Sequence, residues 1–283
     1  MKKNKALKSV FGIYTGIFIF VLYAPLIVLT ILSFQVGPEG GPQFPLQGFS
    51  LYWYEQLFGL TPPSRVAPLD LGDAIFRSLT LAIITMIVST ILGTLTAQAF
   101  RKNFKGSGLV FYLILLGIMV PGILVGLGIA LVSNTLGIDK NWYSTSFVAH
   151  VLYTYPFAFI VMLAIFNRFD RSIEEAAMDL GANELKTFWR ITLPQVIPGL
   201  LSAALFAFTL SYDEFPRTLF AAGPDLTLPL TIFGTFSIEV HPNLFAFGVL
   251  TTLFSFSILI LYYFLMMIFT RKPKRLNVQE DIN

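Results

Sequence analysis

The chain has 283 residues, of which 55% are hydrophobic and only 12% are charged, and its formal net charge is +3. Its mean hydropathy of +0.73 excludes an ordinary soluble globular domain and indicates a membrane protein that crosses the bilayer several times. The lack of cysteine excludes disulfides, cysteine-based metal sites and thiol catalysis. The net charge of +3 comes mostly from the excess of basic residues in the loops on one side of the membrane, and it indicates no nucleic-acid partner.

Six apolar stretches are long enough to cross a membrane, which takes roughly 20 mostly apolar residues. They cover residues 11–33, 74–100, 107–132, 144–166, 197–220 and 244–270. The expected fold is therefore all-α, with a transmembrane domain of six helices over 11–270 between short tails at 1–10 and 271–283. The first stretch is too long for the apolar part of a signal peptide and lacks a cleavage site, so we interpret it as an uncleaved helix.

Lysine and arginine are concentrated on one side of this arrangement. They precede the first span, separate the second from the third and the fourth from the fifth, and follow the sixth. The other side has only Arg65, Arg77, Lys140 and Arg217. Because basic loops stay in the cytoplasm, we expect both termini and the segment 167–196 to be cytoplasmic.

The predicted external loop at 34–73 is rich in proline and glycine, which opposes regular helix. Within it, the stretch 50–58 carries several aromatic residues and predicts a short helix at the membrane surface. An anchor at the membrane surface is favoured for this stretch over a ligand site.

Proline and glycine also interrupt the third and fourth predicted spans. Pro121 and Gly122 lie inside the third, and Pro156 follows Tyr155 inside the fourth. Freed backbone groups in a membrane need protein neighbours or a water-filled cavity, so Pro121 and Tyr155 are candidates for a substrate pathway. Close helix packing at Gly122-x-x-x-Gly126 explains the glycines equally well.

The cytoplasmic segment between the fourth and fifth spans is polar and favours helix. Ser172 and Glu175 match a capping box at the start of one short helix, and Gly181 provides the freedom to end it. Asn183 is placed to cap a second helix, and Pro194 is expected to stop that helix. The segment therefore predicts a helix-turn-helix elbow on the cytoplasmic face.

Two carboxylates lie in the outer part of the fifth predicted span. Asp213 and Glu214 follow Tyr212, and ionisable groups are costly in a membrane, so a cavity or a partner is expected. Arg217 is on the same helix face, and an Asp213–Arg217 pair stabilising a helix kinked at Pro216 is one interpretation. The other is that Tyr212 and one of the carboxylates contact a cationic substrate.

The two histidines, His150 and His241, show no metal-binding spacing, so no zinc site is expected, and we place each at a membrane interface. Asp225 and Glu239 lie in the predicted external segment 221–243. They are expected to meet an external protein or solvent.

The cytoplasmic segment also carries a family pattern: Glu-Ala-Ala, three residues, Gly, nine residues, Ile-x-Leu-Pro. The chain matches it without a gap at Glu175, Ala176, Ala177, Gly181, Ile191, Leu193 and Pro194. On these residues the chain resembles the permease subunits of binding-protein-dependent ABC importers. The basic N-terminus, the proline-rich loop, the six spans and the sequence at 211–215 resemble the second permease subunit of spermidine/putrescine-type importers.

The resemblance implies a type I ABC importer permease in a bacterial inner membrane, with the elbow docking as a coupling helix on an ATPase subunit. The implied docking residues are Glu175, Ala176, Ala177, Asp179, Gly181, Ala182 and Asn183. The implied partners are two ATPase subunits, a second and different permease, an external substrate-binding protein and lipid. No cofactor or catalytic residue is implied, and the sequence has no phosphate-binding loop, so ATP is expected on another chain.

Three other functions stay open at this point. An importer for another small solute, such as phosphonate, thiamine or iron, shares the same elbow. An ion-coupled secondary transporter would show internal repeats, which inspection does not reveal. A membrane-embedded enzyme would need a nucleophile with a base or a metal cluster, which the two isolated histidines disfavour.

Overall fold

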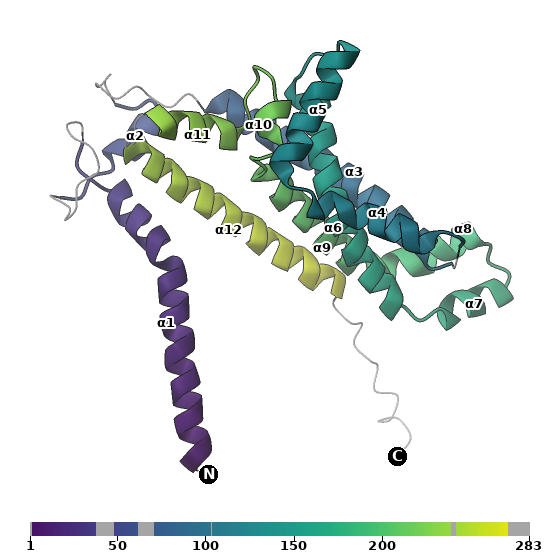
Figure 1. Cartoon of the computed structure of the whole chain (residues 1–283). Helices are drawn as coiled ribbons and strands as arrows, with labels where there is room; N and C mark the ends of the chain where they lie inside the picture. The colour runs from purple at the N-terminus through teal and green to yellow at the C-terminus, as the bar shows by residue number, and fades with distance from the viewer. Residues whose placement is uncertain (1, 38–47, 62–70, 103, 239–241, 271–283) are drawn as a thin grey trace. The chain divides into compact units, whose positions relative to one another are not determined.

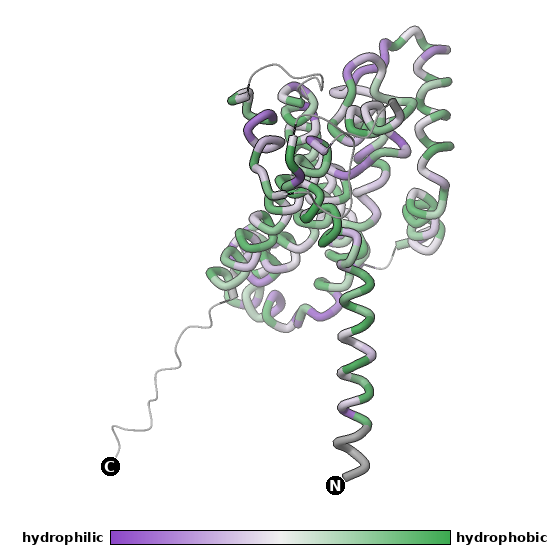
Figure 2. Tube along the Cα trace, turned by 90° about the vertical axis from the view of Figure 1, so that its left-hand side faces the viewer, coloured by the Kyte–Doolittle hydropathy of each residue, from purple (hydrophilic) through white to green (hydrophobic). Residues whose placement is uncertain are grey.

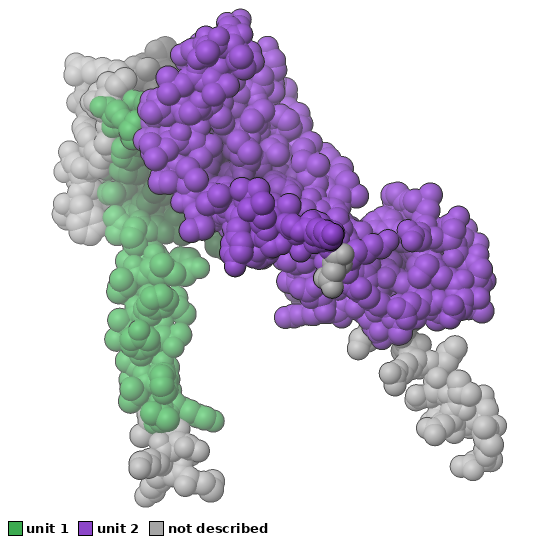
Figure 3. Space-filling model, turned by 45° about the vertical axis from the view of Figure 1, so that its right-hand side comes forward, with its two compact units in different colours: residues 1–70, 232–258 green, residues 71–231, 259–283 purple. Residues whose placement is uncertain are grey.

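The computed structural model describes residues 2–37, 48–61, 71–102, 104–238 and 242–270, and these parts of the chain contain helices and turns but no strand. The chain divides into two compact units, which Figure 3 shows in different colours. Unit 1 comprises residues 1–70 and 232–258, and unit 2 comprises 71–231 and 259–283.

Unit 1 contains a long N-terminal helix, α1 (Lys2–Ser33), and a short one, α2 (Tyr52–Leu57). The segment Leu7–Ser33 of α1 is apolar over most of its length, which is largely green in Figure 2. The most apolar part of it has no buried residue. A helix that is apolar all round and exposed is suited to lipid or to another apolar protein surface. The first predicted span lies inside α1.

Helix α2 confirms the short helix predicted within 50–58, but its tryptophan has a different role. Trp53 is fully buried and packs on Ala246, in the helix α12 (Pro242–Thr270). Within the same unit, the hydroxyls of Ser33 and Tyr54 lie 2.7 Å apart. Trp53 therefore contributes to the core of unit 1 instead of anchoring the chain at a membrane surface.

Unit 2 is built around three long helices, α3 (Gly72–Phe100), α6 (Phe147–Arg168) and α9 (Leu193–Tyr212), each packed on the other two. Small residues let the backbones approach closely. A Cβ added at Gly93 of α3 would lie 2.7 Å from the backbone nitrogen of Phe159 in α6. The buried core joins all three helices and comprises Ala97, Ala158, Phe159, Met162, Phe166, Val196 and Ala203.

The third predicted span is broken into α4 (Ser107–Met119) and α5 (Gly122–Leu136), which meet at an angle of 99° (Figure 1). The backbone of Val120 is extended, because a proline disfavours the helical conformation in the residue before it. Pro121 therefore interrupts this span, as the sequence predicted. The fourth predicted span comprises the π-helical turn η1 (Trp142–Ser146) and α6, and Pro156 lies inside α6 without ending it.

The fifth predicted span starts much earlier than expected. It is preceded by the short helix α7 (Ser172–Asp179). The helix α8 (Glu184–Thr187), the π-helical turn η2 (Phe188–Thr192) and α9 then form one continuous helix from Glu184 to Tyr212. Pro194 does not stop it. The proline lies in the first turn of α9, directly after η2. Proline has no N–H to donate to the preceding turn, and the wider winding of the π-helical turn leaves room for its ring.

The same span also ends earlier than predicted, at Tyr212. Residues 213–217 are not helical, and α10 (Thr218–Ala221) and α11 (Leu228–Ile238) follow. Across the described ranges, five helices are long and apolar enough to cross a membrane: Leu7–Ser33, Gly72–Phe100, Trp142–Arg168, Glu184–Tyr212 and Pro242–Phe269. The bent pair α4–α5 makes six, the number predicted. The C-terminal tail lies outside the described residues.

Candidate functional site

The polar elbow comprises residues 172–187 at one end of unit 2, where α7 and α8 lie beyond the ends of α6 and α9 (Figure 1). Gly181 ends α7 with a left-handed backbone (φ +88°), and the N–H of Ala182 bonds to the carbonyl of Ala177 at 3.0 Å. Glycine adopts this conformation without a steric penalty. The side-chain oxygen of Asn183 accepts from the N–H of Lys186 at 2.8 Å, so both predicted roles are confirmed.

The predicted capping box is wrong. Arg171 precedes α7 without a side-chain capping bond, and Ser172 is already helical. Its N–H donates to Oδ1 of Asp170 at 3.0 Å, so Asp170 takes the place that the capping box assigns to the carboxylate of Glu175. Hydrogen bonds from Ser172 lower the pKa of Asp170, the bond from the backbone N–H more than the bond from the side chain.

The seven predicted docking residues lie together on α7 and the following turn. All are exposed except Ala177 and Ala182, which are partly buried. Large apolar side chains are exposed beside them, with Leu180 90%, Leu185 67% and Trp189 60% accessible. Exposed apolar groups edged by charged residues mark a surface that meets another protein or the membrane.

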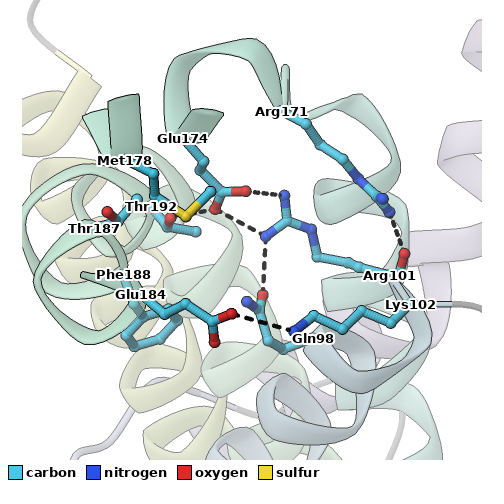
Figure 4. Close-up of a pocket in the computed structure, with 10 residues that line it drawn as sticks. All are labelled: Gln98, Arg101, Lys102, Arg171, Glu174, Met178, Glu184, Thr187, Phe188 and Thr192. Atoms are coloured by element: carbon cyan, nitrogen blue, oxygen red, sulfur yellow. Dashed lines mark hydrogen bonds and ion pairs between the residues drawn. The ribbon is translucent and has the colours of Figure 1, made fainter. Parts of the chain in front are cut away.

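The side of α7 that faces the bundle carries an ion pair. The two terminal guanidinium nitrogens of Arg101, at the end of α3, donate to the carboxylate of Glu174, at 2.9 and 2.6 Å (Figure 4). The two side chains are 7% and 15% exposed. Thr192 donates a further hydrogen bond to Glu174, and Arg171 donates one to the backbone carbonyl of Arg101. We call the contact between Arg101 and Glu174 the clamp.

The clamp sets the charge state of Glu174. Burial raises the pKa of this carboxyl, but the hydrogen bonds from Arg101 and Thr192, together with the charges of Arg101 and Arg171, outweigh burial and lower the pKa overall. Glu174 therefore stays charged at neutral pH. The clamp is not visible in the sequence, because its two residues are 73 positions apart and no local pattern indicates their pairing.

A second polar region lies where α9 ends, and its pairing differs from the one considered in the sequence. Arg217 pairs with Glu214 at 3.1 Å, not with Asp213, and both paired side chains are buried. The same carboxylate accepts the backbone N–H of Arg217 at 2.9 Å. Because 213–217 is a turn and not a kinked helix, the Glu214 side chain turns back to the N–H of Arg217, directly before α10, while Asp213 is exposed.

Neighbouring helices enclose the Arg217 side chain. Its guanidinium lies 3.8 Å from the ring centroid of Tyr153 in α6. A Cβ added at Gly122 would lie 2.8 Å from its Nη1, and one added at Gly126 would lie 2.3 Å from its carbonyl oxygen. The two glycines therefore allow close packing of α5 on this turn, as the glycine spacing suggested.

His150 is buried beside this turn. Its two ring nitrogens lie 2.7 Å from the Ser211 hydroxyl and 2.8 Å from the Thr218 hydroxyl. Two hydroxyl partners satisfy the ring inside the bundle, and the location of His150 at the level of a membrane interface stays a prediction. His241 and Glu239 lie outside the described residues, and Asp225 pairs with Arg77 at 3.6 Å.

The substrate-path candidates divide into two groups. Three of them, Tyr212, Asp213 and Glu214, follow one another at the end of α9, where the ring of Tyr212 stacks on that of Phe208. Pro121 belongs to the same group, because it adjoins Gly122, the glycine that contacts Arg217. Tyr155 lies elsewhere: its hydroxyl is 3.0 Å from that of Thr96 in α3, and its ring packs on the core. Tyr153, two positions earlier and so on the opposite face of α6, takes the place beside Arg217.

The chain combines long apolar helices, a span broken at Pro121, buried polar groups where α9 ends and an exposed elbow. These features define a polytopic membrane protein. Residues 89–275 match the family model described as "Binding-protein-dependent transport system inner membrane component". The chain belongs to this family and is a transport subunit, not an enzyme.

Two curated relatives cover most of the chain. It is 33% identical over 237 residues to the putrescine transport system permease protein PotI of Escherichia coli, covering 81% of this chain and 80% of that one. It is 31% identical over 250 residues to the spermidine/putrescine transport system permease protein PotC of Haemophilus influenzae, covering 86% and 93%.

Solved structures share the fold. A chain of a bacterial ABC transporter that imports the acidic polysaccharide alginate superposes with a TM-score of 0.71 at 17% identity, covering 95% of this chain and 98% of that chain. A chain of the MetNI methionine ABC transporter superposes with a TM-score of 0.56 at 15% identity, covering 70% and 97%. These likenesses support a type I ABC importer permease fold.

Proposed function

We propose that this chain is a permease subunit of an ATP-driven importer for a polyamine such as putrescine or spermidine. The single observation that carries the coupling role is the exposed elbow. It presents its predicted docking residues outward, follows α6 after three residues and contains the start of the long helix Glu184–Tyr212. The polyamine substrate is supported by the names of the two relatives, which align over four fifths or more of this chain.

In this proposal the elbow inserts into a cleft of an ATPase subunit. The docking surface comprises Glu175, Ala176, Ala177, Asp179, Gly181, Ala182 and Asn183, and the exposed Leu180 adds apolar area that water leaves on binding. Closure of the ATPases then moves the elbow and shifts the permease between inward-open and outward-open states.

One elbow engages one ATPase, so a machine with two ATPases needs a second permease, which we propose is a different chain. An external binding protein delivers the substrate. The bias of basic residues supports a bacterial inner-membrane orientation with both termini and the elbow in the cytoplasm.

Among the path candidates, Asp213 offers the better contact for a cationic substrate. Glu214 is committed to Arg217, whereas Asp213 is exposed beside the partly exposed Tyr212. A carboxylate next to an aromatic ring is suited to an alkylammonium group, which is attracted by both.

The elbow is tested with two substitutions at Gly181. Nothing lies within 4 Å of a Cβ added there, so the chain itself leaves room for a side chain, although leucine is disfavoured at φ +88°. Gly181→Leu is expected to abolish uptake in vesicles while membrane insertion stays intact. Gly181→Asn separates backbone strain from blocked docking: asparagine tolerates this backbone conformation but still adds a side chain to the docking surface, so it is expected to lower uptake as well. Normal uptake by Gly181→Leu would overturn the docking role.

The substrate is tested with Asp213→Asn in vesicles loaded with ATP. Uptake of putrescine or spermidine is expected to fall severalfold, whereas Asp139→Asn, which removes an exposed carboxylate from the turn after α5, is expected to have no effect. Full polyamine uptake by Asp213→Asn would exclude the carboxylate contact. Uptake of phosphonate, thiamine or iron by the parent complex, without polyamine uptake, would replace the proposed substrate.

A further inference from the structure

We propose that Arg101 and Glu174 are positioning residues for energy coupling: the clamp ties the elbow to α3, so that a displacement of the elbow moves the centre of the helix bundle. The inference rests on the proposed docking of the elbow to an ATPase. It assigns a role to a contact inside this chain, on the side of α7 that faces the bundle.

The clamp has the geometry of a fixed contact. It is bidentate, with distances of 2.9 and 2.6 Å, and its side chains are 7% and 15% exposed. Two aromatic rings hold the arginine side, because its guanidinium carbon lies 5.2 Å from the ring centroid of Phe166 and 5.1 Å from that of Phe169. A planar guanidinium held between rings and a carboxylate has little freedom to rotate, and lysine would not reproduce this geometry.

The clamp joins three parts of unit 2. Arg101 follows directly after α3, Glu174 is in the first turns of α7, and Thr192, which donates to Glu174, belongs to the continuous helix from Glu184 to Tyr212. The hydrogen bond from Arg171 to the carbonyl of Arg101 reinforces the same junction. A force on α7 is therefore passed to α3 and to the fifth span at one point.

Helix α3 is well placed to receive that force. It packs on both α6 and α9, its Ala97 is in the core, and its Ser89 hydroxyl lies 2.7 Å from that of Thr154 in α6. Because packed cores respond to displacement as connected bodies, a shift at the end of α3 is transmitted along the bundle.

An open pocket of about 150 Å³ lies beside the clamp, lined by residues of α3, α7, α8 and η2 and by residues next to these elements (Figure 4). Within it, the hydroxyl of Thr187 is buried without a hydrogen-bond partner, and the residue is 4% exposed. The elbow is thus held to α3 through polar contacts around an open space, which leaves room for the elbow to tilt if the clamp is removed.

A neighbouring ion pair provides a matched control. Lys102 and Glu184 also link the end of α3 to the elbow, but their distance is 3.7 Å and both side chains are 82% exposed. Exposed pairs of this kind contribute little. Lys102→Gln removes one positive charge from the position next to Arg101, so it separates loss of the clamp from a general change of charge.

The first experiment measures uptake and ATP hydrolysis together in proteoliposomes holding the complete transporter and its binding protein. Arg101→Gln and Glu174→Gln are each expected to lower the number of substrate molecules imported per ATP about tenfold. A tenfold change lies within the range of interaction free energies between residues in contact. Co-purification of the ATPase subunit with the permease is expected to stay at the parental level. Lys102→Gln is expected to match the parent in all three measurements.

The second experiment restores the link by a covalent route. The chain contains no cysteine, so an Arg101→Cys/Glu174→Cys double variant presents two thiols in this subunit. A short bifunctional methanethiosulfonate that spans the lost side chains is expected to recover import per ATP, and dithiothreitol is expected to abolish the recovery. The parent complex and each single cysteine variant receive the same reagent as controls.

The outcomes distinguish this inference from the proposed function. Parental import per ATP in Arg101→Gln and Glu174→Gln, or no recovery in the bridged and fully assembled double variant, would overturn the positioning role. Loss of the ATPase from the purified complex would show a role in assembly instead and would also overturn it. A parent complex that shows no ATP-dependent uptake would refute the proposed function itself.

Discussion

Two arginine–glutamate pairs in unit 2, one buried and one partly buried, use the same chemistry over very different sequence separations. Glu214 and Arg217 are three residues apart in one turn, whereas Arg101 and Glu174 come from elements 73 positions apart. The first pair satisfies the backbone of its own turn and fills a space between helices. The second joins separate elements, so a short-range pair stabilises a local break while a long-range pair fixes one element relative to another.

The two pairs are expected to respond differently to mutation. Damage to the Glu214–Arg217 turn should lower the stability of the bundle, because the charges are enclosed by α5, α6 and α10. Damage to the clamp should change coupling more than stability, because one side of it borders a cavity.

The largest stability effect is expected from Arg217→Met. It leaves the carboxylate of Glu214 buried without its partner and removes the contact with Tyr153, which should cost about 3 to 5 kcal/mol. The free energy of unfolding in detergent, or the corresponding drop in Tm, measures the loss. Adding Glu214→Gln should recover part of it, since the unpaired charge is then absent; an unchanged Tm in the single variant would show that the turn tolerates a free carboxylate.

The next effect concerns the close approach of α5 to the same turn. Gly126→Ala places a Cβ 2.3 Å from the carbonyl oxygen of Arg217, so α5 must move away, at a cost of about 1 to 3 kcal/mol. Gly128→Ala is the matched control, because nothing lies within 4 Å of its Cβ, and added helix propensity should stabilise α5 by up to about 1 kcal/mol. Equal Tm shifts for the two variants would contradict the close packing.

A smaller effect is expected in the elbow, and it tests the corrected helix start. Asn183→Ala removes the cap of α8 and should destabilise it by about 1 kcal/mol, seen as faster hydrogen exchange of the Lys186 amide. Ser172→Ala should leave exchange in α7 unchanged, because its hydroxyl does not cap that helix and Asp170 accepts its N–H. Faster exchange in α7 would restore the capping box.

The smallest effect is a pH dependence confined to acid. The pKa of Glu174 is lowered in the folded protein, so the clamp contributes fully above the unfolded value of 4.5 and is lost as pH falls through the lowered folded pKa. The Tm difference between the parent and Glu174→Gln should be constant between about pH 5 and 8 and disappear in stronger acid. A difference that changes between about pH 6 and 8 would indicate another titrating group.

Local patterns predicted much of the elbow and the overall organisation. The apolar runs placed six spans, Pro121 indicated the broken one, and Gly181 and Asn183 were assigned their roles because each acts on its nearest backbone neighbours. The capping box was wrong because Asp170, two residues before the helix, offers a competing acceptor.

Other features depend on tertiary contacts and were not visible in the sequence. Helical spacing placed Asp213 and Arg217 on one face, but the chain forms a turn there and pairs Glu214 instead. Pro194 was expected to end a helix, yet the preceding π-helical turn accommodates it. The clamp requires knowing that the end of α3 meets α7, which no local pattern indicates.

The unbroken course of the helix from Glu184 to Tyr212 has a mechanical consequence. At 1.5 Å per residue its 29 residues span roughly 43 Å, with the docking turn adjoining one tip and Asp213 the other. One continuous helix thus joins the docking turn to the Asp213 carboxylate. We therefore expect a displacement of the elbow to change how this carboxylate is presented to the substrate, alongside the route through the clamp and α3.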